Sequence, residues 1–187
     1  MPMKKLARVS RALDAIGRTC GIGVAWLILP MVMSLVWEVT ARYLFDAPTT
    51  WAYDMTFMLY GTFFMVGSAW TLQRGGHIRT DTYYARWSRR TQARVDLVCY
   101  AFLFFPAFSI LAWLGWEYFW KSFQQNERIV TSPWLPIVWP FKFMIPFAMV
   151  LLLLQGVSEF LKAWSRALGP GVDDIARPAA SEGEVSI

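Results

Sequence analysis

Long stretches without a charged residue are the feature that most restricts how this chain can fold. A helix that crosses a lipid bilayer needs roughly 20 mainly apolar residues, and the chain contains four stretches of about that length. Because 56% of its 187 residues are hydrophobic and only 17% are charged, the bilayer is the expected solvent. The sequence therefore predicts an all-α membrane protein whose four spans lie at about 19–41, 51–72, 95–120 and 136–162.

The fourth span is the least regular, because prolines interrupt it. Either Pro136 or Pro140 is expected to begin the helix, since a proline in the first turn loses no internal hydrogen bond. Pro146 would then lie in the helix interior and kink it. The same segment carries three charged side chains, Lys142, Glu159 and Lys162.

Basic residues are distributed unevenly around the four spans. Of 18 Lys and Arg residues, 14 lie in the N-terminal segment, the loop between the second and third spans, and the C-terminal tail. The positive-inside rule therefore places both termini and this loop in the cytoplasm. The net charge of +5 comes from short basic blocks between apolar runs, so nucleic acid is not an expected partner.

The chain is expected to form a single membrane domain over 1–166, followed by a disordered cytoplasmic tail over 167–187. A cleaved leader is not expected, because the first apolar run is longer than a usual signal-peptide core and no small-x-small cleavage site follows it. Cys20 and Cys99 each stand alone in or beside an apolar run, and both are predicted to be small buried hydrophobes.

The segment 78–94, between the second and third spans, is too polar to cross a membrane and too aromatic for a plain connector. On a helical wheel its aromatic residues share one arc and its arginines share the adjoining arc. This pattern predicts an interfacial amphipathic helix that contacts phospholipids, with an ordinary basic loop as the alternative. The residues concerned are Tyr83, Tyr84 and Trp87 on the first arc and Arg79, Arg86, Arg89 and Arg90 on the second.

Two loop motifs lie at the two ends of the second span. RGGHIRTD, at 74–81, resembles the GGHIRVD-type signature of the small membrane subunits of tripartite ATP-independent periplasmic (TRAP) transporters. EVTARYLFDAPTTWAYD, at 38–54, resembles the aRYlF..P..WaeE pattern of the same family, although Asp54 stands near the usual Glu and Thr80 replaces the usual Val. The fourth apolar segment is similar to members of the branch that includes mannitol and chloroaromatic transporters.

The resemblance implies a non-enzymatic subunit of a three-part transporter in the bacterial inner membrane. Its partners would be a large multi-span permease subunit and a periplasmic solute-binding protein. The large subunit would carry the sodium ions and an organic acid or similar solute in an elevator-type movement, and this chain would be its fixed scaffold. No cofactor is expected in this chain, and the transported solute is not defined by its sequence.

The hairpin between the first two spans, expected on the periplasmic side and at the subunit interface, contains one basic residue, Arg42. It is predicted to pair with Glu38 or Asp54, while Pro48 and Trp51 fix the turn. A solvated arginine at the membrane surface is the alternative.

The cytoplasmic motif comprises Arg74, Gly75, Gly76, His77, Arg79 and Asp81. Its glycines permit a sharp turn after the second span. The histidine, the second arginine and the aspartate are then predicted to form a hydrogen-bonded corner, or else to contact lipid headgroups. A single histidine has no second ligand for a metal or a haem, so no metal site is predicted.

Tryptophans at the opposite membrane surface are expected to form an aromatic belt, made of Trp116, Trp120, Trp134 and Trp139. A sharper hypothesis uses Trp120 and Trp134, together with Glu127 and Arg128, to dock the solute-binding protein.

Two other functions fit a four-span chain. A membrane redox or quinone-linked subunit would need paired histidines or adjacent thiols in its spans. A stand-alone small exporter would need an ionisable residue near the bilayer midplane, and the apolar stretches contain none.

Overall fold

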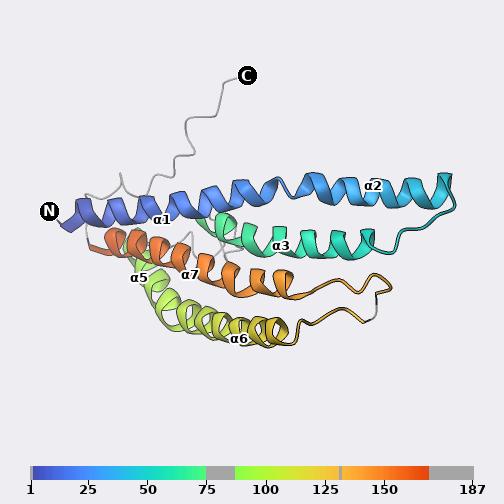
Figure 1. The fold of residues 1–187 in the computed structure, drawn as a ribbon. Coiled ribbons are helices and arrows are strands. Elements are labelled where there is room, and N and C mark those ends of the chain that lie inside the picture. The colour runs from blue at the N-terminus through green and yellow to red at the C-terminus, as the bar shows by residue number, and fades with distance from the viewer. Residues whose placement is uncertain (1, 75–86, 131, 169–187) are drawn as a thin grey trace, which may run out of the picture.

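The computed structural model describes residues 2–74, 87–130 and 132–168, and within these ranges all regular structure is helical (Figure 1). An isolated bridge between Arg128 and Ile137 is the one extended pairing in the described residues. The helices are α1 (Pro2–Ala25), α2 (Ile28–Leu44), α3 (Ala52–Gln73), α5 (Arg89–Cys99), the π-helix η1 (Tyr100–Phe104), α6 (Phe105–Gln124) and α7 (Trp139–Leu168).

Four helical segments are long and apolar enough to cross a membrane, which confirms the predicted all-α fold with four spans. They cover Leu6–Leu44, Ala52–Gln73, Arg90–Gln124 and Trp139–Ala167. The helices of the first and third spans begin at Pro2 (α1) and Arg89 (α5), upstream of the predicted 19 and 95. Hydropathy measures only the part of a helix that suits hydrocarbon, and a helix continues into the polar region wherever its backbone bonds remain satisfied.

The first span is two helices in line, interrupted at Trp26 and Leu27. Pro30 explains the interruption, because proline lacks an N–H and its ring clashes with the carbonyl four residues earlier, here that of Trp26. Here the backbone forms hydrogen bonds between residues three apart instead of four. The Leu27 nitrogen donates to the Val24 oxygen at 2.9 Å, and the Leu29 nitrogen donates to the Trp26 oxygen at 3.2 Å. The axis then continues as α2.

The third span contains a π-helical turn for a similar reason. Pro106 cannot donate to the carbonyl of Phe102, and the chain inserts one turn of wider helix, η1, immediately before it. The nitrogen of Phe105 bonds to the oxygen of Tyr100, five residues earlier. The span bends where α5 passes into α6, as Figure 1 shows.

The fourth span begins at Trp139, so that Pro140 occupies its first turn and Pro136 lies in the preceding connection. Pro146 is inside α7, as predicted. It faces Gly115 of α6, where an added Cβ would lie 3.4 Å from the Pro146 nitrogen. The two helices therefore approach closely at the proline.

Helix α7 lies at the centre of the bundle and packs against α1, α3, α5 and α6, whereas α2 packs against α3. The core between α3 and α7 is formed by Val66, Ala69, Leu72, Ala148, Leu151 and Leu152. Small residues permit the closest contacts: Gly156 receives the ring of Phe104, and Gly21 receives Trp70. Close approach at small residues is typical of helix pairs in membranes.

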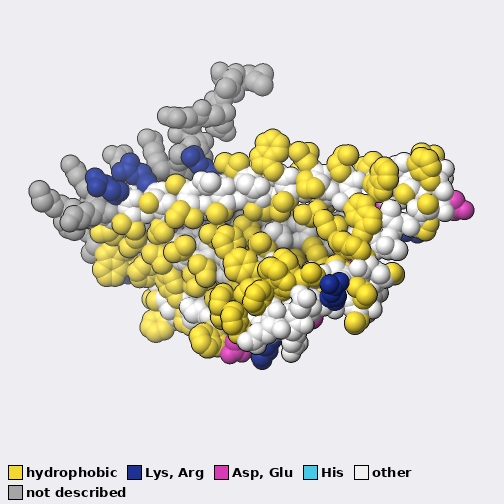
Figure 2. Space-filling view, in the orientation of Figure 1, with side chains coloured by type: hydrophobic (Ala, Val, Ile, Leu, Met, Phe, Trp, Pro, Cys, Tyr) yellow, Lys and Arg dark blue, Asp and Glu magenta, His cyan; other side chains and the backbone are white. Residues whose placement is uncertain are grey.

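Hydrophobic side chains cover much of the outer face in Figure 2, as expected for a surface that meets lipid or another membrane subunit. The prediction that both cysteines are buried is wrong for Cys99, which is exposed on α5, while Cys20 is half-buried. In a bilayer an apolar side chain has little preference between lipid and a neighbouring helix. Hydrophobicity alone therefore does not determine burial within the chain.

The connections divide the bundle into two ends. One, called here the N-terminal end, contains the start of α1, the end of α3, the start of α5 and the end of α7; the opposite end contains the α2–α3 and α6–α7 connections (Figure 1).

Candidate functional site

Polar side chains gather at both ends of the bundle, and at the opposite end the first cluster is centred on Glu38. The Arg42 Nε donates to its Oε1 at 2.9 Å, and the Thr49 nitrogen donates to its Oε2 at 2.9 Å. A second arginine nitrogen and the threonine hydroxyl add further contacts. Of the two predicted partners for Arg42, the structure therefore selects Glu38, which lies one helical turn away.

The α2–α3 turn also contains a backbone hydrogen bond and a residue in the left-handed region. The nitrogen of Ala47 donates to the oxygen of Ala41 at 3.0 Å, and Asp46 adopts a left-handed φ of 50°. Aspartate tolerates this conformation better than most side chains. Pro48 lies exposed in the turn, and Trp51, half-buried, immediately precedes α3.

Asp54, the other predicted partner of Arg42, contacts a different part of the chain. Its Oδ2 accepts a hydrogen bond from the hydroxyl of Ser132, which lies in the α6–α7 connection. The same hydroxyl accepts from the nitrogen of Trp134 at 3.2 Å. The first turn of α3 is thus tied to the second connection. The sequence did not single out Ser132, because a lone serine in a loop gives no signal of its partner.

Lys142 forms the third contact at this end. It is 4% exposed, and its Nζ lies 2.5 Å from Oε2 of Glu127 and 3.8 Å from the ring centroid of Tyr118. The hydrogen bond from Lys142 lowers the pKa of the Glu127 carboxyl below its ordinary value of 4.5, and Ser122 contributes to the same shift. The α6–α7 connection is therefore closed by a charge pair at its base.

The four residues predicted to dock a binding protein all lie in or near this connection, but their side chains differ in the contacts that they already make within the chain. Trp120 and Trp134 are 45% and 43% exposed. Arg128 is exposed, and its Nη1 donates to the Leu135 oxygen at 3.3 Å. The carboxylate of Glu127, by contrast, already accepts a hydrogen bond from Lys142.

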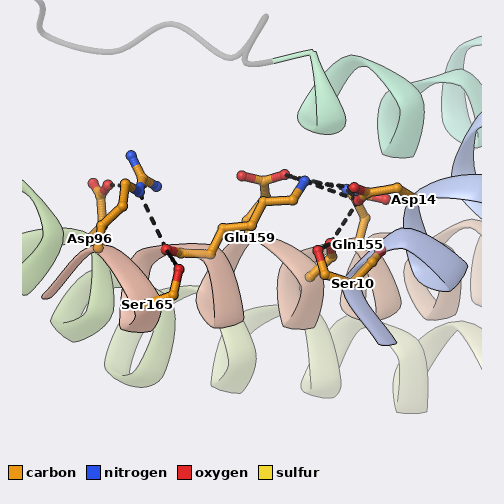
Figure 3. Close-up of polar contacts among 9 residues, drawn as sticks. Ser10, Asp14, Asp96, Gln155, Glu159 and Ser165 are labelled. Atoms are coloured by element: carbon orange, nitrogen blue, oxygen red, sulfur yellow. Dashed lines mark hydrogen bonds and ion pairs between the residues drawn. The ribbon is translucent and has the colours of Figure 1, made fainter. Parts of the chain in front are cut away.

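The N-terminal end holds another polar cluster, shown in Figure 3, in which Asp14 of α1 accepts several hydrogen bonds. Asp14 Oδ1 accepts from Gln155 Nε2 at 2.8 Å and from the Ser158 hydroxyl at 2.7 Å, and Lys162 Nζ lies 2.9 Å from Oδ2. Lys162 also pairs with Glu159 at 2.8 Å. This cluster locks α1 to α7.

Sequence reasoning missed this N-terminal cluster, although a signal was present. Ser10, Asp14 and Gly17 recur at helical spacing in α1, and Gln155, Ser158, Glu159 and Lys162 do the same in α7. Two polar stripes near the same ends of spans predict a shared polar face.

Only part of the cytoplasmic motif and the interfacial segment can be placed. Arg74 lies over the ring of Trp70, with its Cζ 4.4 Å from the centroid. Arg89 and Arg90 belong to the first turn of α5, for which Ser88 is the N-cap, and Trp87 is 45% exposed. Gly75, Gly76, His77, Arg79, Asp81, Tyr83, Tyr84 and Arg86 lie outside the described residues.

These contacts join elements of the bundle to one another. Across residues 2–74, 87–130 and 132–168, no group of three or more His, Cys, Asp or Glu side chains is placed to hold a metal ion. The charged side chains of the N-terminal cluster are engaged with one another across α1 and α7.

Comparison with known families adds the deciding observation. Residues 31–166 match the family described as tripartite ATP-independent periplasmic transporters, DctQ component. The chain belongs to this family. As a DctQ component it is part of a transporter and is not an enzyme, and the family implies association with a large TRAP permease subunit and a solute-binding protein. A search of curated proteins finds no match. The matched region contains both connections at the opposite end, α3, and α7 almost to its end.

Proposed function

We propose that this chain is the scaffold subunit of a TRAP transporter, which anchors the large permease subunit in the membrane while that subunit moves the solute. The observation that carries the proposal is the family match over 31–166. The geometry supports it, because polar contacts join distant parts of the chain at both ends of the bundle: Asp14 of α1 to Lys162 of α7 at one, and Asp54 of α3 to Ser132 of the α6–α7 connection at the other. A frame against which another subunit moves must itself resist movement.

The orientation that fits this role places the N-terminal end in the cytoplasm. The basic N-terminal segment and Arg74 lie at that end, which agrees with the positive-inside rule. The segment 78–94 would then lie against cytoplasmic phospholipids, and the tail would be cytoplasmic in a bacterial inner membrane.

The opposite end would face the periplasm and help to dock the solute-binding protein. Trp120, Arg128 and Trp134 are the side chains proposed for this contact, since they lie beside a connection that is closed at its base by Glu127 and Lys142. The complex would take up an organic acid or similar solute, driven by sodium ions bound in the large subunit.

Reconstitution tests the proposal directly. The chain would be tagged on its C-terminal tail, purified with the large subunit that accompanies it, and placed in proteoliposomes with the solute-binding protein. Uptake of organic acids under a sodium gradient is expected to require all three proteins. Uptake by this chain alone, or full uptake without it, would show that it is not a scaffold.

A further inference from the structure

Two side-chain oxygens beside Gly17 of α1 are shielded from solvent, yet neither accepts a hydrogen bond from the described part of the chain. They are Oε1 of Gln73, at the end of α3, and Oε1 of Gln155, in α7. A Cβ built on Gly17 would lie 2.9 Å from the Gln155 oxygen and 3.9 Å from the Gln73 oxygen. Three helices therefore meet around one point, and two of them present a hydrogen-bond acceptor to it.

The orientation of the Gln155 amide is fixed by its other contacts. Its Nε2 donates to Asp14 at 2.8 Å and lies 3.4 Å from a carboxylate oxygen of Glu159. Because the nitrogen must face these acceptors, the amide oxygen is held toward Gly17. The residue is 1% exposed, so bulk water does not reach this oxygen.

A buried carbonyl oxygen without a donor costs about 1–3 kcal/mol, and buried waters in proteins usually bridge groups of this kind. We propose that a single water molecule binds beside Gly17 and donates one hydrogen to Gln73 Oε1 and the other to Gln155 Oε1. Glycine allows the close approach of these groups, since an added Cβ would lie 2.9 Å from the Gln155 oxygen. The water extends the Asp14 cluster to α3 and so joins three helices.

A metal cation fits the same position less well. Hard cations take about six oxygen ligands or more, whereas two neutral amide oxygens are presented here. The nearest carboxylates, Asp14 and Glu159, are already paired with Lys162. The chemistry therefore favours a neutral donor over a positive ion.

A crystal structure of the full chain grown in a lipid mesophase, at a resolution that shows other buried waters, tests the proposal. The expected result is a density peak about 2.7–3.2 Å from both oxygens. Three results would overturn the proposal. The first is a direct hydrogen bond between the two amides, and the second is a donor from residues 75–86. The third is a peak at about 2.4 Å from the oxygens that changes when sodium is replaced by potassium.

A mutational cycle gives a second test that needs no map. Gly17→Ala is expected to lower the melting temperature of the chain in detergent, while Gly23→Ala is the matched control, because no atom lies within 4 Å of an added Cβ there. Gln73→Leu removes one acceptor of the water. If the two sites share that water, the loss from Gly17→Ala is smaller in the Gln73→Leu background, whereas strictly additive losses would overturn the proposal. Neither test depends on transport.

Discussion

The Nζ of Lys162 in α7 lies 2.9 Å from Oδ2 of Asp14 in α1, although the two residues are 148 positions apart in the sequence. Their side chains are 14% and 20% exposed, so the pair lies largely inside the bundle. This contact joins the middle of α1 to the last turns of α7. It is the clearest point at which stability and the proposed scaffold role can be tested together.

Asp14→Ala is expected to destabilise the chain by about 2 kcal/mol, because it leaves the donors of Gln155, Ser158 and Lys162 short of an acceptor. Unfolding in mixed detergent, followed by circular dichroism, measures the loss. Arg11→Ala is the control, since this arginine is exposed and, within the described residues, its hydrogen bond is to Ala7 of its own helix. Equal stability of the two variants would mean that the N-terminal cluster does not hold α1 to α7.

The two partners of the Lys142–Glu127 pair should respond unequally to removal. Glu127→Ala leaves the ammonium of a lysine that is 4% exposed without its carboxylate, and we expect a loss of about 2 kcal/mol. Lys142→Met substitutes an apolar side chain of similar length and leaves a carboxylate that is 42% exposed and can be hydrated, so its loss should be smaller. Chemical unfolding of both variants, with the double variant completing the cycle, checks the order. The reverse order would contradict the assignment of Lys142 as the buried partner.

Low pH should weaken the contact between Glu127 and Lys142 over a defined pH range. The hydrogen bond from Lys142 lowers the pKa of Glu127 below 4.5 in the folded chain. A carboxyl with a lowered folded pKa contributes stability that is complete above its unfolded pKa and is lost as pH falls through the folded value. The stability difference between wild type and Glu127→Gln is therefore expected to be constant above pH of about 5 and to shrink below pH of about 4.5. A difference that instead shrinks between pH 6 and 8 would assign the effect to another group.

Arg42→Ala is predicted to reduce assembly with the large subunit more than it reduces stability. The Arg42 side chain is 53% exposed, and exposed ion pairs contribute little to folding. Its contact with Glu38 nevertheless fixes the surface of the hairpin that is proposed to meet the partner. The yield of large subunit that co-purifies with the tagged chain measures assembly, with Lys121→Ala, also exposed at this end, as the control. If the Arg42→Ala variant showed wild-type yield of the large subunit and wild-type transport, the α2–α3 hairpin would not be part of the subunit interface.

Gly156→Ala should destabilise the contact between α7 and the π-helical turn. An added Cβ would lie 2.3 Å from Cε1 of Phe104, so the ring must move, at a cost of about 1–3 kcal/mol. Gly67→Ala is the matched change in α3, where no atom lies within 4 Å, and the better helix propensity of alanine is expected to stabilise by about 0.5–1 kcal/mol. Melting temperatures of the two variants should therefore shift in opposite directions.

The sequence alone determined the number of membrane-crossing helices, because the transfer of apolar side chains into a bilayer depends on composition along the chain. It also indicated Glu38 as one of two candidate partners of Arg42, since residues four apart on a helix are neighbours, and the structure then chose Glu38 over Asp54. The loop motifs carried the family resemblance, which the match over 31–166 bears out.

Only the tertiary structure decided which faces of the helices meet. It brought Asp14 to Lys162 and Asp54 to Ser132, and it left Cys99 on the outside. Hydropathy cannot distinguish these outcomes, because a side chain facing lipid and one facing another helix are in similarly apolar surroundings. Long-range polar pairs depend on how helices rotate and approach, which is set by close contacts such as those at Gly21 and Gly156. The composition of the chain thus determines where its membrane-spanning helices lie, and the packing of those helices determines which side chains meet.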